Sequence, residues 1–222
     1  MKINRLEILT GNLKAQLQFY RDLLGLETRG ENENFFEIIV GYSVLKFTSS
    51  TNFTPYHIAI HIPDKQEEKA LVWLKNRVEV LKNGDEEIVD FSAWDARSVY
   101  FYDADGNIME FISRRSFFKP GSDKFSEKSL LGIAEIGLPT ANIPEKFDLL
   151  NKHFLLEKFD GDFNVFCAIG DDLGLLITID KNKKDWFPTH EKASSSDFKI
   201  QFNHQNTEHS FDFKNDTLEI KT

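Results

Sequence analysis

A strand–helix–strand–strand–strand pattern recurs along this 222-residue chain and constrains its fold more than any other feature. Residues 3–10 alternate between the two faces of a strand. Apolar residues at helical spacing follow in residues 13–24, and three further strand-like segments end near residue 48. The same order of elements recurs in residues 56–113 and again from residue 131. The pattern predicts an α+β fold built from repeated modules.

The repeats divide the chain into two predicted domains. Residues 3–50 and 56–113 are two modules of a first domain that covers residues 1–115. Residues 116–129 are polar and rich in turn-forming residues, which is typical of a linker. Residues 130–222 form the second domain. Its last module has about ten residues between its first two strands, too few for a helix, so this half is predicted to be degenerate.

Composition excludes several classes of function. The formal net charge of −9 argues against binding to nucleic acid or to anionic membrane surfaces, since both need clustered Lys and Arg. Cys167 is the single cysteine, so no disulfide can form within the chain, which fits a reducing compartment. The sequence shows no signal peptide and no long apolar run. These features together predict a cytoplasmic protein.

The segment Tyr56–Ile62 carries the most distinctive polar residues. Three isoleucines occupy one face of this predicted strand, and His57, Ala59 and His61 occupy the other. A face of this kind lines a narrow or chemically active space. Glu110 is likewise the only carboxylate in an otherwise apolar strand at residues 108–112. His57 and Glu110 are therefore the first candidates for a functional site.

Two other segments carry structural predictions. Asp64, followed three residues later by Glu67, matches a capping box that would start the helix of the second module. Trp186 and Phe187, in an irregular segment, are expected to plug a cavity or to cover the sheet. The chain has no phosphate-binding glycine loop, no nucleophile elbow and no Cys-x-x-Cys pair.

Taken together, these motifs resemble those of the vicinal oxygen chelate superfamily, which includes glyoxalase I, bleomycin-resistance proteins and extradiol dioxygenases. The matching residues are Asn12-Leu13 with residues 19–26, then residues 57–59 and residues 103–111. The resemblance covers residues 1–115 well, and the rest of the chain by topology. It implies paired βαβββ modules that form cupped mixed sheets around a ligand cavity, here as tandem glyoxalase-like domains.

The resemblance also implies where a divalent metal would bind. Carried over by position, the ligand sites are Arg5, Lys46, His57 and Glu110. His57 and Glu110 are ordinary ligands for Fe, Mn, Ni or Zn. Arg5 and Lys46 are not metal ligands in their charged forms. In the second half, Glu135 and Glu219 fall at equivalent positions without an aligned histidine, so that half is predicted to be structural.

Two hypotheses follow for this face. In the first, Glu7 completes a metal site with His57 and Glu110, while Arg5, Lys46 and His61 bind the substrate. In the second, no metal is bound, and Arg5 and Lys46 neutralise Glu7 and Glu110 through charge-assisted hydrogen bonds.

The corresponding functions belong to different classes. One is a metal-dependent lyase or ring-cleaving dioxygenase in which His57 and Glu110 are catalytic. The other is a metal-free protein that binds or sequesters a small aromatic or anionic molecule. In both cases the expected partner is a small-molecule ligand, bound to a monomer or homodimer on the concave sheet face of residues 1–115.

Overall fold

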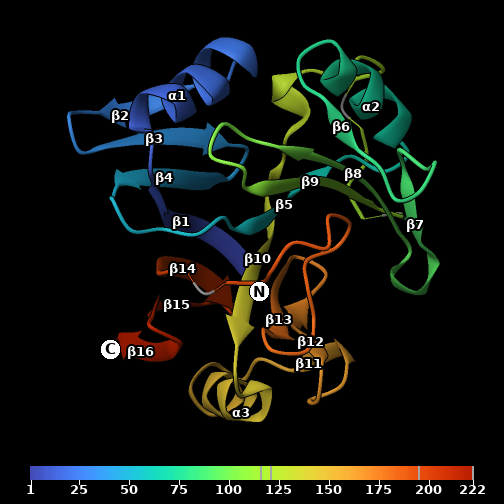
Figure 1. Ribbon diagram of the computed structural model, residues 1–222. Helices are drawn as coiled ribbons and strands as arrows, with labels where there is room; N and C mark the ends of the chain where they lie inside the picture. Colours follow the sequence, from blue (N-terminus) through green and yellow to red (C-terminus); the bar gives the residue numbers. More distant parts are fainter. Residues whose placement is uncertain (116, 121, 195, 222) are drawn as a thin grey trace.

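The computed structural model describes residues 1–221 except 116, 121 and 195, so two positions of the predicted linker lie outside the described part. The chain forms four successive modules, which we call modules I to IV (Figure 1). Module I consists of β1 (Lys2–Thr10), α1 (Leu13–Leu17), a π-helical segment (Gln18–Leu23), β2 (Thr28–Glu31), β3 (Phe35–Val40) and β4 (Ser43–Ser49). Module II consists of β5 (His57–Ile62), α2 (Glu67–Lys75), β6 (Val80–Leu81), β7 (Val89–Phe91), a 3₁₀ turn (Ser92–Trp94), β8 (Ala96–Tyr102) and β9 (Ile108–Arg114).

A short 3₁₀ turn (Glu127–Ser129) precedes the second half of the chain. Module III consists of β10 (Gly132–Thr140), α3 (Ile143–Phe154), β11 (Lys158–Gly161), β12 (Phe166–Asp171) and β13 (Gly174–Asp180). Module IV consists of β14 (Phe198–His204), β15 (Thr207–Lys214) and β16 (Thr217–Lys221). As predicted, module IV has no helix between its first two strands.

The first strands of the modules determine how the modules pair. Strand β1 pairs antiparallel with β14, which joins module I to module IV. Strand β5 pairs antiparallel with β10, which joins module II to module III. The two half-sheets meet where Ile3 of β1 pairs with Ile133 of β10, so all sixteen described strands belong to one sheet. The predicted domains 1–115 and 130–222 remain a prediction, because strand pairing crosses the boundary between them.

Each half-sheet has two faces of different character. The helix face packs against the helices and forms the main core, which includes Leu6, Ile58 and Phe111. We call the opposite face the open face. A bulge between Ile3 and Arg5 breaks the alternation of β1. Simple alternation predicts that Ile3 shares the face of Arg5, but the bulge turns Ile3 into the core together with Leu6.

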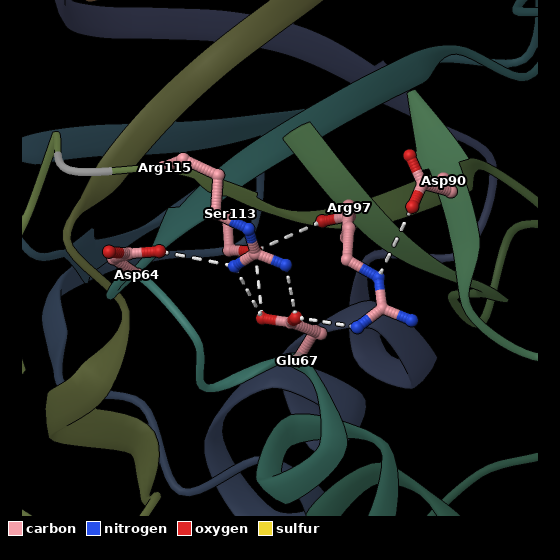
Figure 2. A network of polar contacts seen from close by, with 6 residues as sticks. All are labelled: Asp64, Glu67, Asp90, Arg97, Ser113 and Arg115. Carbon is pink, nitrogen blue, oxygen red and sulfur yellow. Dashed lines mark hydrogen bonds and ion pairs between the residues drawn. The ribbon is translucent and has the colours of Figure 1, made fainter. Parts of the chain in front are cut away.

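The predicted capping box at the start of α2 is wrong. The helix begins at Glu67, and its N-cap is Gln66, whose side chain makes no capping hydrogen bond. The Glu67 carboxylate instead accepts hydrogen bonds from Arg97 of β8, from Ser113 of β9 and from Arg115, which directly follows β9 (Figure 2). Burial raises the pKa of Glu67, but the hydrogen bonds from Arg115, from the Glu67 backbone N–H and from Ser113 outweigh burial and lower it to about 2.

The helices are short, and the longest α-helix described, α3, has 12 residues. Within the described residues, no helix has the length and apolar character needed to cross a bilayer.

Candidate functional site

Three buried ligand-type side chains converge on the open face of modules II and III. Glu110 of β9 and Glu135 of β10 both lie opposite Ala59 of β5, one on each side. His57 lies on the same face of β5, two residues before Ala59. All three ligand-type residues are at most 5% exposed.

The distances within this triad suit a metal ion. His57 Nε2 lies 3.4 Å from Glu110 Oε2 and 3.8 Å from Glu135 Oε2. One ligand atom from each residue can be chosen so that all three lie within 4.8 Å of one another. Two atoms that bind one transition-metal ion at ~2.1 Å are separated by roughly 3–3.5 Å. One imidazole and two carboxylates are also common ligands of Fe, Mn, Ni and Zn, so the donor set fits a divalent cation.

Neighbouring side chains hold the two carboxylates in place. Ser98 Oγ donates a hydrogen bond of 2.5 Å to Glu110 Oε1, and the Tyr100 hydroxyl also bonds this carboxylate. Arg114 Nη2 donates to Glu135 Oε1 at 3.1 Å. Burial and the nearby charge of Glu135 raise the pKa of Glu110 to about 7, against the opposing effects of His57, Ser98 and Tyr100. A cation at this position would relieve the repulsion between the two buried carboxylates.

The triad lines a cavity of about 470 Å³ between modules II and III. Six aromatic side chains form much of its wall: Phe91, Trp94, Tyr100, Phe166, Trp186 and Phe187. Ile112, Ile177 and Ile179 add apolar surface. Apart from the triad, its charged lining residues are Asp90, Asp160 and Lys184. The volume and the apolar walls are those of a small-molecule site.

Trp186 covers the triad because β10 has a glycine beneath it. A Cβ atom on Gly137 would lie 2.5 Å from the Trp186 ring and 3.3 Å from the Cβ of His57. The Trp186 ring centroid lies 5.4 Å from that of His57. Both Trp186 and Phe187 line the cavity, in line with the prediction that they plug a cavity or cover the sheet.

Three residues predicted to share this site lie elsewhere. Arg5 Nε lies 2.8 Å from Glu7 Oε1, and Lys46 Nζ lies 3.4 Å from Glu7 Oε2. Arg5 also pairs with Glu37 at 2.5 Å. None of these residues lines the cavity of the triad. The proposed grouping of Glu7 with His57 and Glu110 is therefore not found, because β1 pairs with β14 and not with β5.

His61, predicted to bind substrate, also lies outside the lining of this cavity. It is 1% exposed, and its Nε2 atom lies 3.2 Å from the carbonyl oxygen of Leu173. Burial is the main reason that its pKa falls to about 4. Its position indicates a neutral core histidine.

The structure adds polar residues that the sequence pattern does not assign to this site: Ser98 and Tyr100 bond Glu110, and Glu135 and Arg114 lie beside them. The sequence pattern places Glu135 at a ligand-equivalent position of the second half, but its partners come from module II. Arg114 follows Glu110 by four residues, so period-two alternation already places both on the same face. The ligand-equivalent position of Glu135 is visible in the sequence, but the sequence does not show which modules pair.

Comparisons with known proteins agree with this architecture. No family model matches the chain. The chain is 31% identical over 116 residues to metallothiol transferase FosB from Staphylococcus epidermidis, a match covering 49% of this chain and 80% of that protein. The FosB protein of Staphylococcus haemolyticus matches with the same identity and coverage.

Among solved structures, a candidate dioxygenase from Bacillus subtilis subsp. subtilis str. 168 superposes with a TM-score of 0.60 at 15% identity. The match covers 81% of this chain, which spans 63% of that longer protein. At this level of identity the likeness concerns the fold alone.

Proposed function

Because the chain belongs to the vicinal oxygen chelate superfamily of glyoxalase, bleomycin-resistance and dioxygenase proteins, we propose that it is a metal-dependent enzyme for a small aromatic substrate. The reaction would be that of a lyase or a ring-cleaving dioxygenase. The observation that supports this most strongly is the convergence of His57, Glu110 and Glu135 at an aromatic cavity.

In this proposal, His57 Nε2 and one oxygen each of Glu110 and Glu135 hold the ion. The ion would be Fe, Mn, Ni or Zn. When bound, it supplies Lewis-acid activation of a substrate oxygen. Ser98 and Tyr100 orient the Glu110 carboxylate through their hydroxyl groups. Trp186 packs on the His57 ring and shields it from water.

The cavity wall supports an aromatic substrate over a strongly anionic one. Aromatic side chains favour offset-stacked or edge-to-face contacts with a planar ligand. Among the described lining residues, Lys184 is the one lysine or arginine, and Asp90 and Asp160 offset its charge. A multiply charged anion would therefore gain little from the wall, and its affinity would depend on the metal. The relatives of this chain from Staphylococcus are named metallothiol transferases, so thiol transfer is a further reaction to assay.

A metal-free binding protein is a second candidate, and two contacts of His57 favour it. A protonated His57 lies close enough to both carboxylates for ion pairs, at 3.4 and 3.8 Å. Such ion pairs would offset part of the carboxylate charge without a metal ion, while His57 Nδ1 has no hydrogen-bond partner among the described residues. The cavity would then bind or sequester an aromatic molecule without turning it over.

Metal analysis separates the two candidates. The purified protein is stripped with chelator, and the binding of Mn²⁺, Ni²⁺ and Zn²⁺, and of Fe²⁺ under anaerobic conditions, is measured by calorimetry. We expect one ion per chain, and we expect His57→Gln to weaken binding by at least about 100-fold, since it removes the only imidazole ligand of the triad. Stoichiometric binding lost in this variant supports the enzyme.

His61→Gln is the matched control, because His61 lies on the same strand and face but outside the cavity. Its metal affinity should equal that of the unmodified chain. A protein that binds none of the four ions, and whose thermal stability chelator does not change, would contradict the metal-dependent enzyme and leave the binding protein.

The proposal also covers the oligomeric state and the cellular location of the protein. All three triad residues come from one chain, so a monomer or a homodimer could carry a complete site. Cys167 is fully buried and unpaired, which supports a cytoplasmic location.

A further inference from the structure

Arg114 is the buried cation closest to the triad in the described ion pairs. It ends β9, and its side chain is 3% exposed. Its Nη2 atom donates to Glu135 Oε1 at 3.1 Å, whereas Glu135 Oε2 lies 3.8 Å from His57 Nε2. The guanidinium therefore occupies one carboxylate oxygen and leaves the other facing the triad.

The surroundings of Arg114 are largely apolar. The guanidinium carbon lies 5.7 Å from the Trp94 ring centroid and 5.6 Å from that of Phe159. Nη1 is 3.6 Å from Asp172 Oδ1, and neither Nε nor Nη1 has a hydrogen-bond partner among the described residues. A buried guanidinium is unfavourable unless it is well paired, so the contact with Glu135 is its main compensation.

The next residue, Arg115, provides a comparison, because its ion pairs lie away from the triad. Arg115 points to the other face and binds Glu67 Oε1 at 2.6 Å and Asp64 Oδ1 at 3.1 Å (Figure 2). Its side chain is 28% exposed. Both arginines pair with a buried glutamate, but only Arg114 contacts a residue of the triad.

We propose that Arg114 is a positioning residue that makes Glu135 a one-oxygen metal ligand. By holding Oε1, it aims Oε2 at the position shared with His57 and Glu110, and it keeps the carboxylate from binding the ion through both oxygens. Its charge also offsets one of the two buried carboxylates. This inference rests on the metal site of the proposed function.

The test measures metal binding and coordination together. Mn²⁺ affinity is measured by calorimetry, and the visible absorption of the Co²⁺-substituted protein reports coordination number and geometry. Loss of an outer contact to a metal ligand commonly weakens binding by about 10- to 100-fold. We expect Arg114→Leu to lose affinity within this range and to change the intensity of the Co²⁺ bands.

Two variants keep the test decisive if Arg114→Leu does not fold. Arg114→Lys keeps the charge but loses the planar guanidinium, so we expect partial rescue, with an affinity between that of Arg114→Leu and the unmodified chain and an altered Co²⁺ spectrum. If Arg114→Leu is unfolded, a Lys variant several-fold weaker than the unmodified chain, with an altered spectrum, supports the inference. Arg115→Leu should retain both the affinity and the spectrum.

An Arg114→Lys protein with unchanged affinity and unchanged Co²⁺ bands would overturn the role of Arg114 while leaving the metal site intact. An unmodified chain that binds neither Mn²⁺ nor Co²⁺ would instead overturn the metal site, and the role of Arg114 with it.

Discussion

The two open faces are built from equivalent strands but differ in how their carboxylates are neutralised. In modules II and III, His57, Glu110 and Glu135 are at most 5% exposed and converge on a cavity. On the open face of modules I and IV, strands β1 and β4 of module I carry Arg5, Glu7 and Lys46, each with a side chain that is 21% exposed. There every carboxylate of the cluster already has a cationic partner.

This difference shows how a repeated module gains or loses a metal site. A carboxylate that pairs with Arg or Lys near solvent needs no ion. Two carboxylates buried beside one imidazole, with one arginine paired to a single one of them, favour an additional positive charge. The register of the strands makes Lys46 of β4 correspond to Glu110 of β9, and Glu7 of β1 to Ala59 of β5. The two faces therefore differ at several corresponding positions, and these substitutions together change their character.

The largest expected difference between the two faces is in metal binding, and replacing one glutamate on each face tests it. Glu135→Gln should weaken divalent-metal binding by about 10- to 100-fold or more, because it removes a ligand. Glu7→Gln should leave metal binding unchanged, because Glu7 is bound to Arg5 and Lys46. Calorimetry with Mn²⁺ measures both variants. Equal losses in the two variants would show that the faces are not as different as we describe.

A pair of glycine variants tests the cover over the triad. The added methyl group of Gly137→Ala would clash with Trp186 at 2.5 Å, so we expect a loss of about 1–3 kcal/mol in unfolding free energy and a displaced indole. The measurements are denaturant unfolding and tryptophan fluorescence.

Gly30→Ala in β2 of module I is the matched control, since its new Cβ meets nothing within 4 Å. It should be close to neutral in stability and should leave the fluorescence unchanged. A Gly137→Ala protein with unchanged stability and an unchanged fluorescence spectrum would refute the tight packing of Trp186 on β10.

The helix face offers a test with a defined pH dependence. The pKa of Glu67 in the folded protein, about 2, lies below its ordinary value. The stabilisation is therefore fully present above about pH 4.5 and is lost as pH falls toward 2. We expect Glu67→Gln to cost about 1–2 kcal/mol at pH 7, reduced from a fully buried pair because Arg97 and Arg115 are partly exposed.

Thermal unfolding between pH 2 and 7 checks this expectation. The stability difference between Glu67→Gln and the unmodified chain should shrink steadily below pH 4.5. A difference that stayed constant over the whole range would mean that the ionised carboxylate contributes nothing.

The smallest effect is expected on the open face of module I. Arg5→Met breaks ion pairs with Glu7 and Glu37, but these side chains are partly solvated. We expect a loss of about 1 kcal/mol or less, decreasing further with added salt. Urea unfolding at low and high salt measures it. A loss of several kcal/mol in unfolding free energy would mean that these partly exposed ion pairs contribute strongly to the stability of the fold.

The sequence by itself determined the modules and one pair of site residues. His57 and Glu110 lie in β5 and β9 of the same module, and these strands are parallel neighbours. Because the pairing within a module follows from its order of strands and helix, alternation was enough to place both side chains on one face. The missing helix of module IV could likewise be read from the spacing of its strands.

Only the tertiary structure decided the third member of the site. The edges of β1, β5, β10 and β14 can each hydrogen-bond to any of the others, so backbone hydrogen bonding does not specify which modules pair. The choice depends on how the helix faces bury their apolar side chains in one core, which is a property of the whole chain. That choice brought Glu135 beside His57 and left Glu7 with Arg5 and Lys46.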